Sequence, residues 1–136
     1  MPCIAVTIEV SPGELIDKLT ILQIKQQQIS DPVQRHNVDV EFAALNAARQ
    51  LQLPVSPELA EQTDRLRAIN QRLWQVEDEL RLSERRGDFG EAFIALARSV
   101  YQLNDQRAAV KRQINTVLGS AFFEEKSYRT KTPPEP

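Results

Sequence analysis

Apolar residues recur every three or four positions along most of the chain, which is the spacing of amphipathic helices. Proline, glycine and capping residues interrupt the pattern at intervals. These signals divide the chain into four predicted helices, which cover residues 12–29, 32–51, 57–86 and 89–118. Short connections between four helices are typical of an up-and-down bundle. The sequence therefore predicts an all-α fold, an antiparallel four-helix bundle formed as a single domain by residues 1–128.

The helix boundaries follow from local signals. Ser11–Glu14 reads SPGE, a capping box with proline at the first helical position, and Ser30–Pro32 ends one helix and caps the next. The stretch LPVSPE (53–58) ends the second helix, and Ser56 and Pro57 within it begin the third. Gly87 is a natural residue to follow a helix, Asp88 is a natural cap for the last helix, and Gly119 ends that helix.

Both ends of the chain depart from the helical pattern. Cys3–Val10 reads CIAVTIEV, which alternates and is rich in β-branched residues, so a short β-strand is predicted. A lone strand is unstable, and we expect this strand to pair with its copy in a homodimer or with the C-terminal tail. Phe122, Phe123 and Tyr128 indicate that this tail folds back on the bundle. Residues 129–136, rich in proline, are expected to be disordered.

A second, polar stripe runs beside the apolar one on the third helix. Asn70, Trp74, Glu77 and Arg81 follow one another at offsets of four, three and four. At about 100° per residue, this stripe borders the apolar arc that contains Leu73. The stripe therefore lies at the edge of the predicted core.

The other three predicted helices also carry polar side chains close to their apolar faces. On the last helix, the residues of the inward arc are aromatic and aliphatic in the first half of the helix. In the second half they are amides and cations. On the second helix, Asn37 and Glu41 lie near a face taken as inward, formed by Val33, Val40, Ala44 and Ala48. The polar positions on the first and last helices are Glu14, Lys18, Lys25, Asn104, Arg107, Lys111 and Asn115.

Buried charges must be paired, hydrogen-bonded or bound to a ligand, which leaves two interpretations. The polar residues form either a structural ion-pair network or a pocket between helices for a small anionic ligand. The candidate ligand-binding residues are Lys18, Lys25, Asn70, Trp74, Arg81, Tyr101, Asn104, Arg107, Lys111 and Asn115. Trp74 and Tyr101 also suit a purely packing role. If the protein is an enzyme, Glu77 or Glu84 is the candidate general acid or base.

Composition narrows the functional classes. The net charge of −2 over 136 residues gives no basis for a nucleic-acid-binding surface. One cysteine, Cys3, and one histidine, His36, exclude a disulfide within the chain and a structural zinc site. No metal and no cofactor is expected. There is no signal-peptide core and no long apolar segment, so we expect a cytoplasmic protein that does not enter a membrane.

Four blocks of the sequence are distinctive: SPGELIDKLTILQIK (11–25), NQRLWQVEDELR (70–81), FIALARSVYQLNDQRAAVKRQIN (93–115) and EEKSY (124–128). Together they resemble an uncharacterised family of small bacterial proteins. The spacing N-x3-W-x2-E-D-x2-R in the second block is also similar to that of another uncharacterised bacterial family. Members of such families tend to be encoded near glycosyltransferase genes, which implies a setting in surface-polysaccharide metabolism but no mechanism.

Two functional hypotheses remain open. In the first, the bundle binds or processes a small anionic metabolite between its helices. In the second, it is a non-enzymatic interaction or adaptor module whose charges set the helix register. Glu77 and Arg81 distinguish the two, because a purely structural pair tolerates replacement by apolar residues and a ligand site does not.

Overall fold

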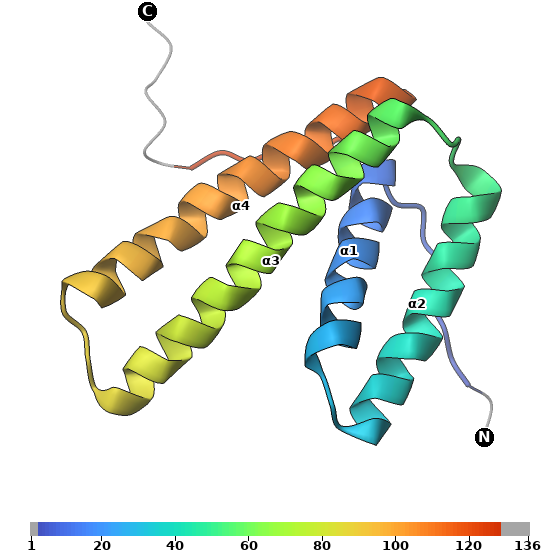
Figure 1. Cartoon of the computed structure of the whole chain (residues 1–136). Coiled ribbons are helices and arrows are strands. Elements are labelled where there is room, and N and C mark those ends of the chain that lie inside the picture. Colours follow the sequence, from blue (N-terminus) through green and yellow to red (C-terminus); the bar gives the residue numbers. More distant parts are fainter. Residues whose placement is uncertain (1–2, 129–136) are drawn as a thin grey trace, which may run out of the picture.

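The computed structural model describes residues 3–128, which contain four helices and no β-strand (Figure 1). The helices are α1 (Pro12–Gln28), α2 (Pro32–Gln52), α3 (Pro57–Arg86) and α4 (Glu91–Leu118). The predicted all-α class and the number of helices are confirmed. The end predicted to be disordered, residues 129–136, lies outside the described residues.

Local capping explains where the helices begin. The side chains of Ser11, Asp31 and Ser56 each accept a hydrogen bond from the backbone N–H three residues later, and proline follows each of them. Helix α4 begins two residues later than predicted. Asp88 does not cap it, because its carboxylate accepts the N–H of Gly90 at 3.2 Å.

The ends of α3 and α4 use the left-handed backbone conformation that glycine adopts without strain. Gly87 has φ +65° and Gly119 has φ +66°, and their N–H groups bond to carbonyls of the preceding turn. The predicted roles of both glycines are therefore confirmed.

Helix α1 is the centre of the arrangement (Figure 1). It packs against α2, α3 and α4, whereas α2 packs against α1 alone among the described helices. Helices α3 and α4 form a long antiparallel hairpin, and the α1–α2 hairpin meets it near the start of α3 and the end of α4. From there α1 and α3 diverge.

The apolar core lies where α1, α3 and α4 meet. Ile16 of α1, Leu59 and Leu66 of α3, and Val110 and Ile114 of α4 form one buried cluster. Burying each such side chain contributes roughly 1.5–3 kcal/mol. This core fixes the upper part of α1 against the hairpin.

The structure corrects the predicted N-terminal strand. Residues 3–10 have no regular secondary structure, and the side chains of Ile4, Val6 and Ile8 are exposed. The prediction rested on alternation and on the β-branched residues, but a strand exists only where a neighbour completes its hydrogen bonds. Pairing with a second copy through Cys3–Val10 stays a prediction.

The inward face assigned to α2 is also wrong. Val33 is 71% exposed and Val40 57% exposed, whereas Val38 is buried. Helix α2 has apolar residues on two sides, and it turns the side with Val38 toward α1. Periodicity identifies an apolar side and cannot decide which of two such sides packs inward.

Residues 120–128 run back along α4, as the sequence predicts (Figure 1). Glu124 bonds to Lys111, Glu125 pairs with Arg112 at 3.3 Å, and the Arg112 guanidinium lies 5.3 Å from the centre of the Phe123 ring. The tail is thus attached mainly through charged groups, while the predicted aromatic anchors remain substantially exposed.

Gly13 lies where α1 is in close contact with α4. A Cβ atom at this position would lie 2.6 Å from the carbonyl oxygen of Lys111 and 2.9 Å from Oδ1 of Asn115. We predict that Gly13→Ala lowers the free energy of unfolding by about 1–3 kcal/mol, because α1 must move away from α4. Urea unfolding measures the change.

Gly90→Ala is the matched control. Its Cβ would meet only the carboxylate of Asp88, at 3.5 Å. Gly90→Ala should lower the free energy of unfolding by less than about 1 kcal/mol, since alanine is merely a poorer cap than glycine. Equal losses for the two variants would contradict the tight α1–α4 contact.

Candidate functional site

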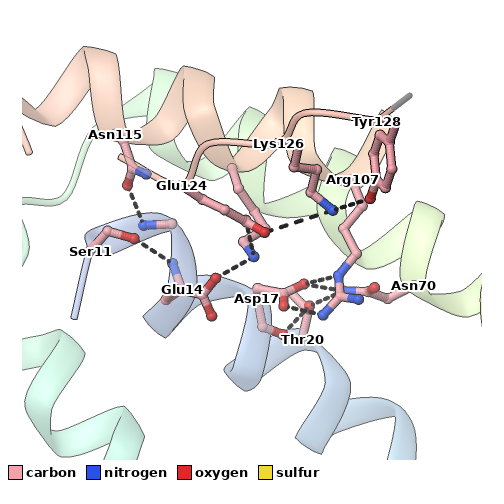
Figure 2. A network of polar contacts seen from close by, with 12 residues as sticks. Ser11, Glu14, Asp17, Thr20, Asn70, Arg107, Asn115, Glu124, Lys126 and Tyr128 are labelled. Atoms are coloured by element: carbon pink, nitrogen blue, oxygen red, sulfur yellow. Dashed lines mark hydrogen bonds and ion pairs between the residues drawn. The ribbon is translucent and has the colours of Figure 1, made fainter. Parts of the chain in front are cut away.

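A buried carboxylate lies at the centre of the site. Asp17 of α1 is 1% exposed. Arg107 of α4 binds it through both Nε, 2.8 Å from Oδ1, and Nη2, which bonds to Oδ2 (Figure 2). Asn70 of α3 donates from Nδ2 to the same Oδ1 at 2.9 Å. One carboxylate therefore joins three helices.

Thr20 completes this group. Its hydroxyl donates to the backbone carbonyl of Asp17 at 2.8 Å and accepts a hydrogen bond from Asn70 at 2.9 Å. We call Asp17, Thr20, Asn70 and Arg107 the Asp17 cluster. The hydrogen bonding of Arg107 to the Asp17 carboxylate, which accepts, raises the pKa of Arg107 and outweighs the opposite effect of burial. The two-point contact also fixes the plane of the guanidinium.

A second group, the Lys111 cluster, lies one turn along α4. The Nζ of Lys111 donates to Glu14 of α1 and, at 3.1 Å, to Glu124 of the tail. Burial alone would lower the pKa of Lys111, but the bonds to Glu14 and Glu124 outweigh it and raise the pKa. Lys111 also lowers the pKa of Glu124. The cluster consists of Glu14, Lys111 and Glu124.

Asn115 extends the contact by a further turn of α4. Its Oδ1 accepts the N–H of Gly13 at 2.7 Å, next to the Ser11 cap of α1 (Figure 2). This N–H belongs to the first turn of the helix, where no carbonyl of α1 is available to it. Asn115 thus caps the neighbouring helix.

An open cleft of about 390 Å³ begins beside the Asp17 cluster, where α1 and α3 diverge. We call it the Trp74 cleft. Its apolar lining consists of Ile21, Ile24, Leu73 and the ring of Trp74, and its polar lining of Asn70, Glu77, Asp78, Arg81 and Arg107. Five residues of the predicted polar stripe and inward arc, Asn70, Trp74, Glu77, Arg81 and Arg107, therefore meet at one cleft.

A smaller cavity of about 230 Å³ lies on the other side of Arg107. Asn104, Lys111, Glu124 and Lys126 contribute to its walls. A third cavity of about 320 Å³ separates the tail from α4 and the start of α1. Carboxylates of Glu14, Glu124 and Glu125 line this third cavity beside its cations, so an anion there would face several like charges.

A model of a protein family of unknown function, DUF6165, matches residues 6–136. The chain belongs to this family. Neither the comparison with curated proteins nor that with solved structures found a match. Family membership therefore identifies the chain without assigning it an activity.

Other predicted residues of this DUF6165 protein lie outside the Trp74 cleft. Lys18 is exposed and lies 3.8 Å from Glu41 of α2, and Lys25 is half-buried in the last turn of α1. Glu84 is exposed near the far end of α3, and Tyr101 is 55% exposed on α4. None of these four lines any of the cavities described above.

The centre of the site, Asp17 and Thr20, is not among the residues predicted from the sequence. A signal was present, because Gly13, Asp17, Thr20 and Ile24 are spaced four, three and four and so line one side of α1. All four are buried. An aspartate in the middle of such a line is a polar group that needs a partner on the facing helix.

Two features are absent from residues 3–128. No group of three or more His, Cys, Asp or Glu side chains in this range is placed to hold a metal ion. None of the helices there is long and apolar enough to cross a membrane.

The pair between Asp17 and Arg107 makes a prediction about stability. Arg107→Met leaves the Asp17 carboxylate buried without its cation and should cost about 3 kcal/mol of unfolding free energy. When Asp17→Asn is also present, no buried charge is left unpaired. The double variant should therefore lose less unfolding free energy than the two single variants lose together. A double-mutant cycle in urea measures the difference; additivity within about 0.5 kcal/mol would contradict the pairing.

The Lys111 cluster predicts a pH dependence. The pKa of Glu124 lies below its ordinary value of 4.5, so its contribution to stability is present above that pH and is lost as the pH falls through the lowered pKa. Glu124→Gln should therefore lower the melting temperature at about pH 7, and this difference should shrink as the pH falls below 4.5.

Glu125→Gln is the matched control, because Glu125 makes an exposed pair with Arg112. Exposed pairs contribute little, so its melting curve should follow that of the unchanged protein. A Glu124→Gln effect that is independent of pH would show that the ionised carboxylate does not hold the tail.

Proposed function

We propose that the chain binds a small amphipathic molecule with an anionic group in the Trp74 cleft. The observation that carries the proposal is the convergence of Asn70, Trp74, Glu77, Arg81 and Arg107 on this one cleft. Its volume of about 390 Å³ lies within the usual range of small-molecule sites. Such sites combine an apolar surface with a few fixed polar groups.

Arg107 suits the role of anchor for the anionic group. Asp17 and the packing of α4 already fix its guanidinium, so little side-chain freedom is lost when a ligand binds. Asp17 also balances its charge, which weakens any long-range attraction for anions. Arg81, whose side chain is 76% exposed, would supply the second cation.

The apolar part of the ligand would lie against Trp74, Leu73 and Ile21. Glu77 and Asp78 stand on the same wall as Arg81, so the four charged residues of the lining balance. A purely anionic molecule therefore gains less here than one that also has an apolar or planar part. Glu77 is the candidate general acid or base if the ligand is a substrate.

The second candidate function, a non-enzymatic adaptor, is favoured by a different observation. The charges of the Lys111 cluster and of Asp17 and Arg107 are already paired with one another. Such a network needs no ligand, because setting the helix register is a sufficient role for it. In that case the protein would act through its outer surfaces.

Trp74 provides a direct readout, since it is the one tryptophan in the sequence and it lines the cleft. We predict that at least one class of compound among nucleotide sugars, sugar phosphates, nucleotides and dicarboxylates changes its fluorescence in a saturable way. Arg81→Gln should weaken that binding about tenfold, because one charge-assisted contact of roughly 1.5 kcal/mol is lost.

Arg85→Gln is the control, as Arg85 is exposed in the last turn of α3 and does not line the cleft. Glu77→Leu combined with Arg81→Leu separates the two candidate functions. Loss of binding in a folded double variant supports the ligand site. No saturable response from any compound class, with cooperative melting intact, contradicts it and favours the adaptor.

A further inference from the structure

Helix α2 has a second apolar side that nothing in the described chain covers. Val33 is 71%, Val40 57% and Leu51 85% exposed. The line they follow contains three further residues, all of them exposed. We call Val33, Asn37, Val40, Ala44, Ala47 and Leu51 the α2 stripe.

The spacing within the α2 stripe is four, three, four, three and four. That is the heptad repeat of a coiled-coil seam, and it extends over nearly the whole of α2, residues 32–52. Val38, Phe42 and Leu45 form the other apolar side, which is buried or half-buried. Helix α2 therefore has one side that packs within the domain and another with the pattern of a helix–helix contact.

We propose that the α2 stripe is the interface at which two copies of this chain associate, α2 against α2. Helix α2 lies at the edge of the arrangement and packs against α1 alone among the described helices (Figure 1). The stripe is thus open to a second molecule over its full length. This inference does not depend on the Trp74 cleft.

Charge favours a second copy as the occupant. A two-fold contact places the same surface patch on both sides, so any charge near the axis meets its own kind. The α2 stripe contains no Lys, Arg, Asp or Glu. The corresponding line on α4, which includes the exposed Ile94 and Tyr101, also contains the charged Arg98 and Asp105, so it is less apolar than the α2 stripe.

The size of the residues also suits two identical helices. Ala44 and Ala47 leave space at the centre of the stripe, which lets two helix backbones approach closely, while Val33, Val40 and Leu51 supply apolar area around them. Asn37 is the one polar member of the stripe. A single asparagine in a seam is known to select one register at some cost in stability.

The test is the oligomeric state of the full chain by light scattering after size exclusion, over a range of concentrations. We expect a dimer, and we expect Ala44→Glu to make it a monomer with unchanged helix content, since Ala44 is exposed in the single chain. Ala97→Glu, at an exposed position of α4, is the matched control and should remain dimeric.

Cross-linking locates the contact. In a Cys3→Ser background, Ala44→Cys should form a covalent dimer on mild oxidation, and Ala97→Cys should not. A native chain that is monomeric up to its solubility limit would overturn the proposal. A dimer that persists in the Ala44→Glu variant would also overturn it. If Val6→Lys abolishes the dimer and Ala44→Glu does not, the contact belongs to residues 3–10 instead.

Discussion

The structure depends on the burial of one carboxylate, that of Asp17. A charge 1% exposed inside a protein is tolerated only with full compensation, and here α3 supplies an amide and α4 a guanidinium. The carboxylate, the amide and the guanidinium come together at one register of α1 on the α3–α4 hairpin. The apolar cluster around Ile16 supplies most of the association energy, while the Asp17 cluster selects the register.

The same constraint shapes the candidate site. Asn70 and Arg107 are both held at Asp17, and both also line the Trp74 cleft. Helices α1 and α3 diverge away from their contact (Figure 1). On the other side, Lys111 and Asn115 hold the beginning of α1 and the tail. One row of polar residues on α4 thus contacts α1 and the tail and contributes to one wall of the cleft. This row consists of Arg107, Lys111 and Asn115.

Sequence patterns predicted what depends on near neighbours. The caps Ser11, Asp31 and Ser56 act within one helical turn, so three of the four helix starts were correct. Partners far apart in the sequence were not predictable: the side of α2 that packs inward depends on α1, and a strand at Cys3–Val10 depends on an edge to pair with. Asp17 was not predicted, because the polar face of α1 was assigned to Glu14, Lys18 and Lys25, and the two lysines lie outside the site.

The most direct test is the exchange of the Arg107 Nε–H proton with water, followed by NMR of arginine side chains. Arg81 serves as the internal reference, because its side chain is 76% exposed. If Asp17 holds Arg107 as described, its Nε–H should exchange far more slowly than that of Arg81, and Asp17→Asn should remove most of the difference. Equally fast exchange at Arg107 and Arg81 in the unchanged protein would contradict the central role of the Asp17 cluster.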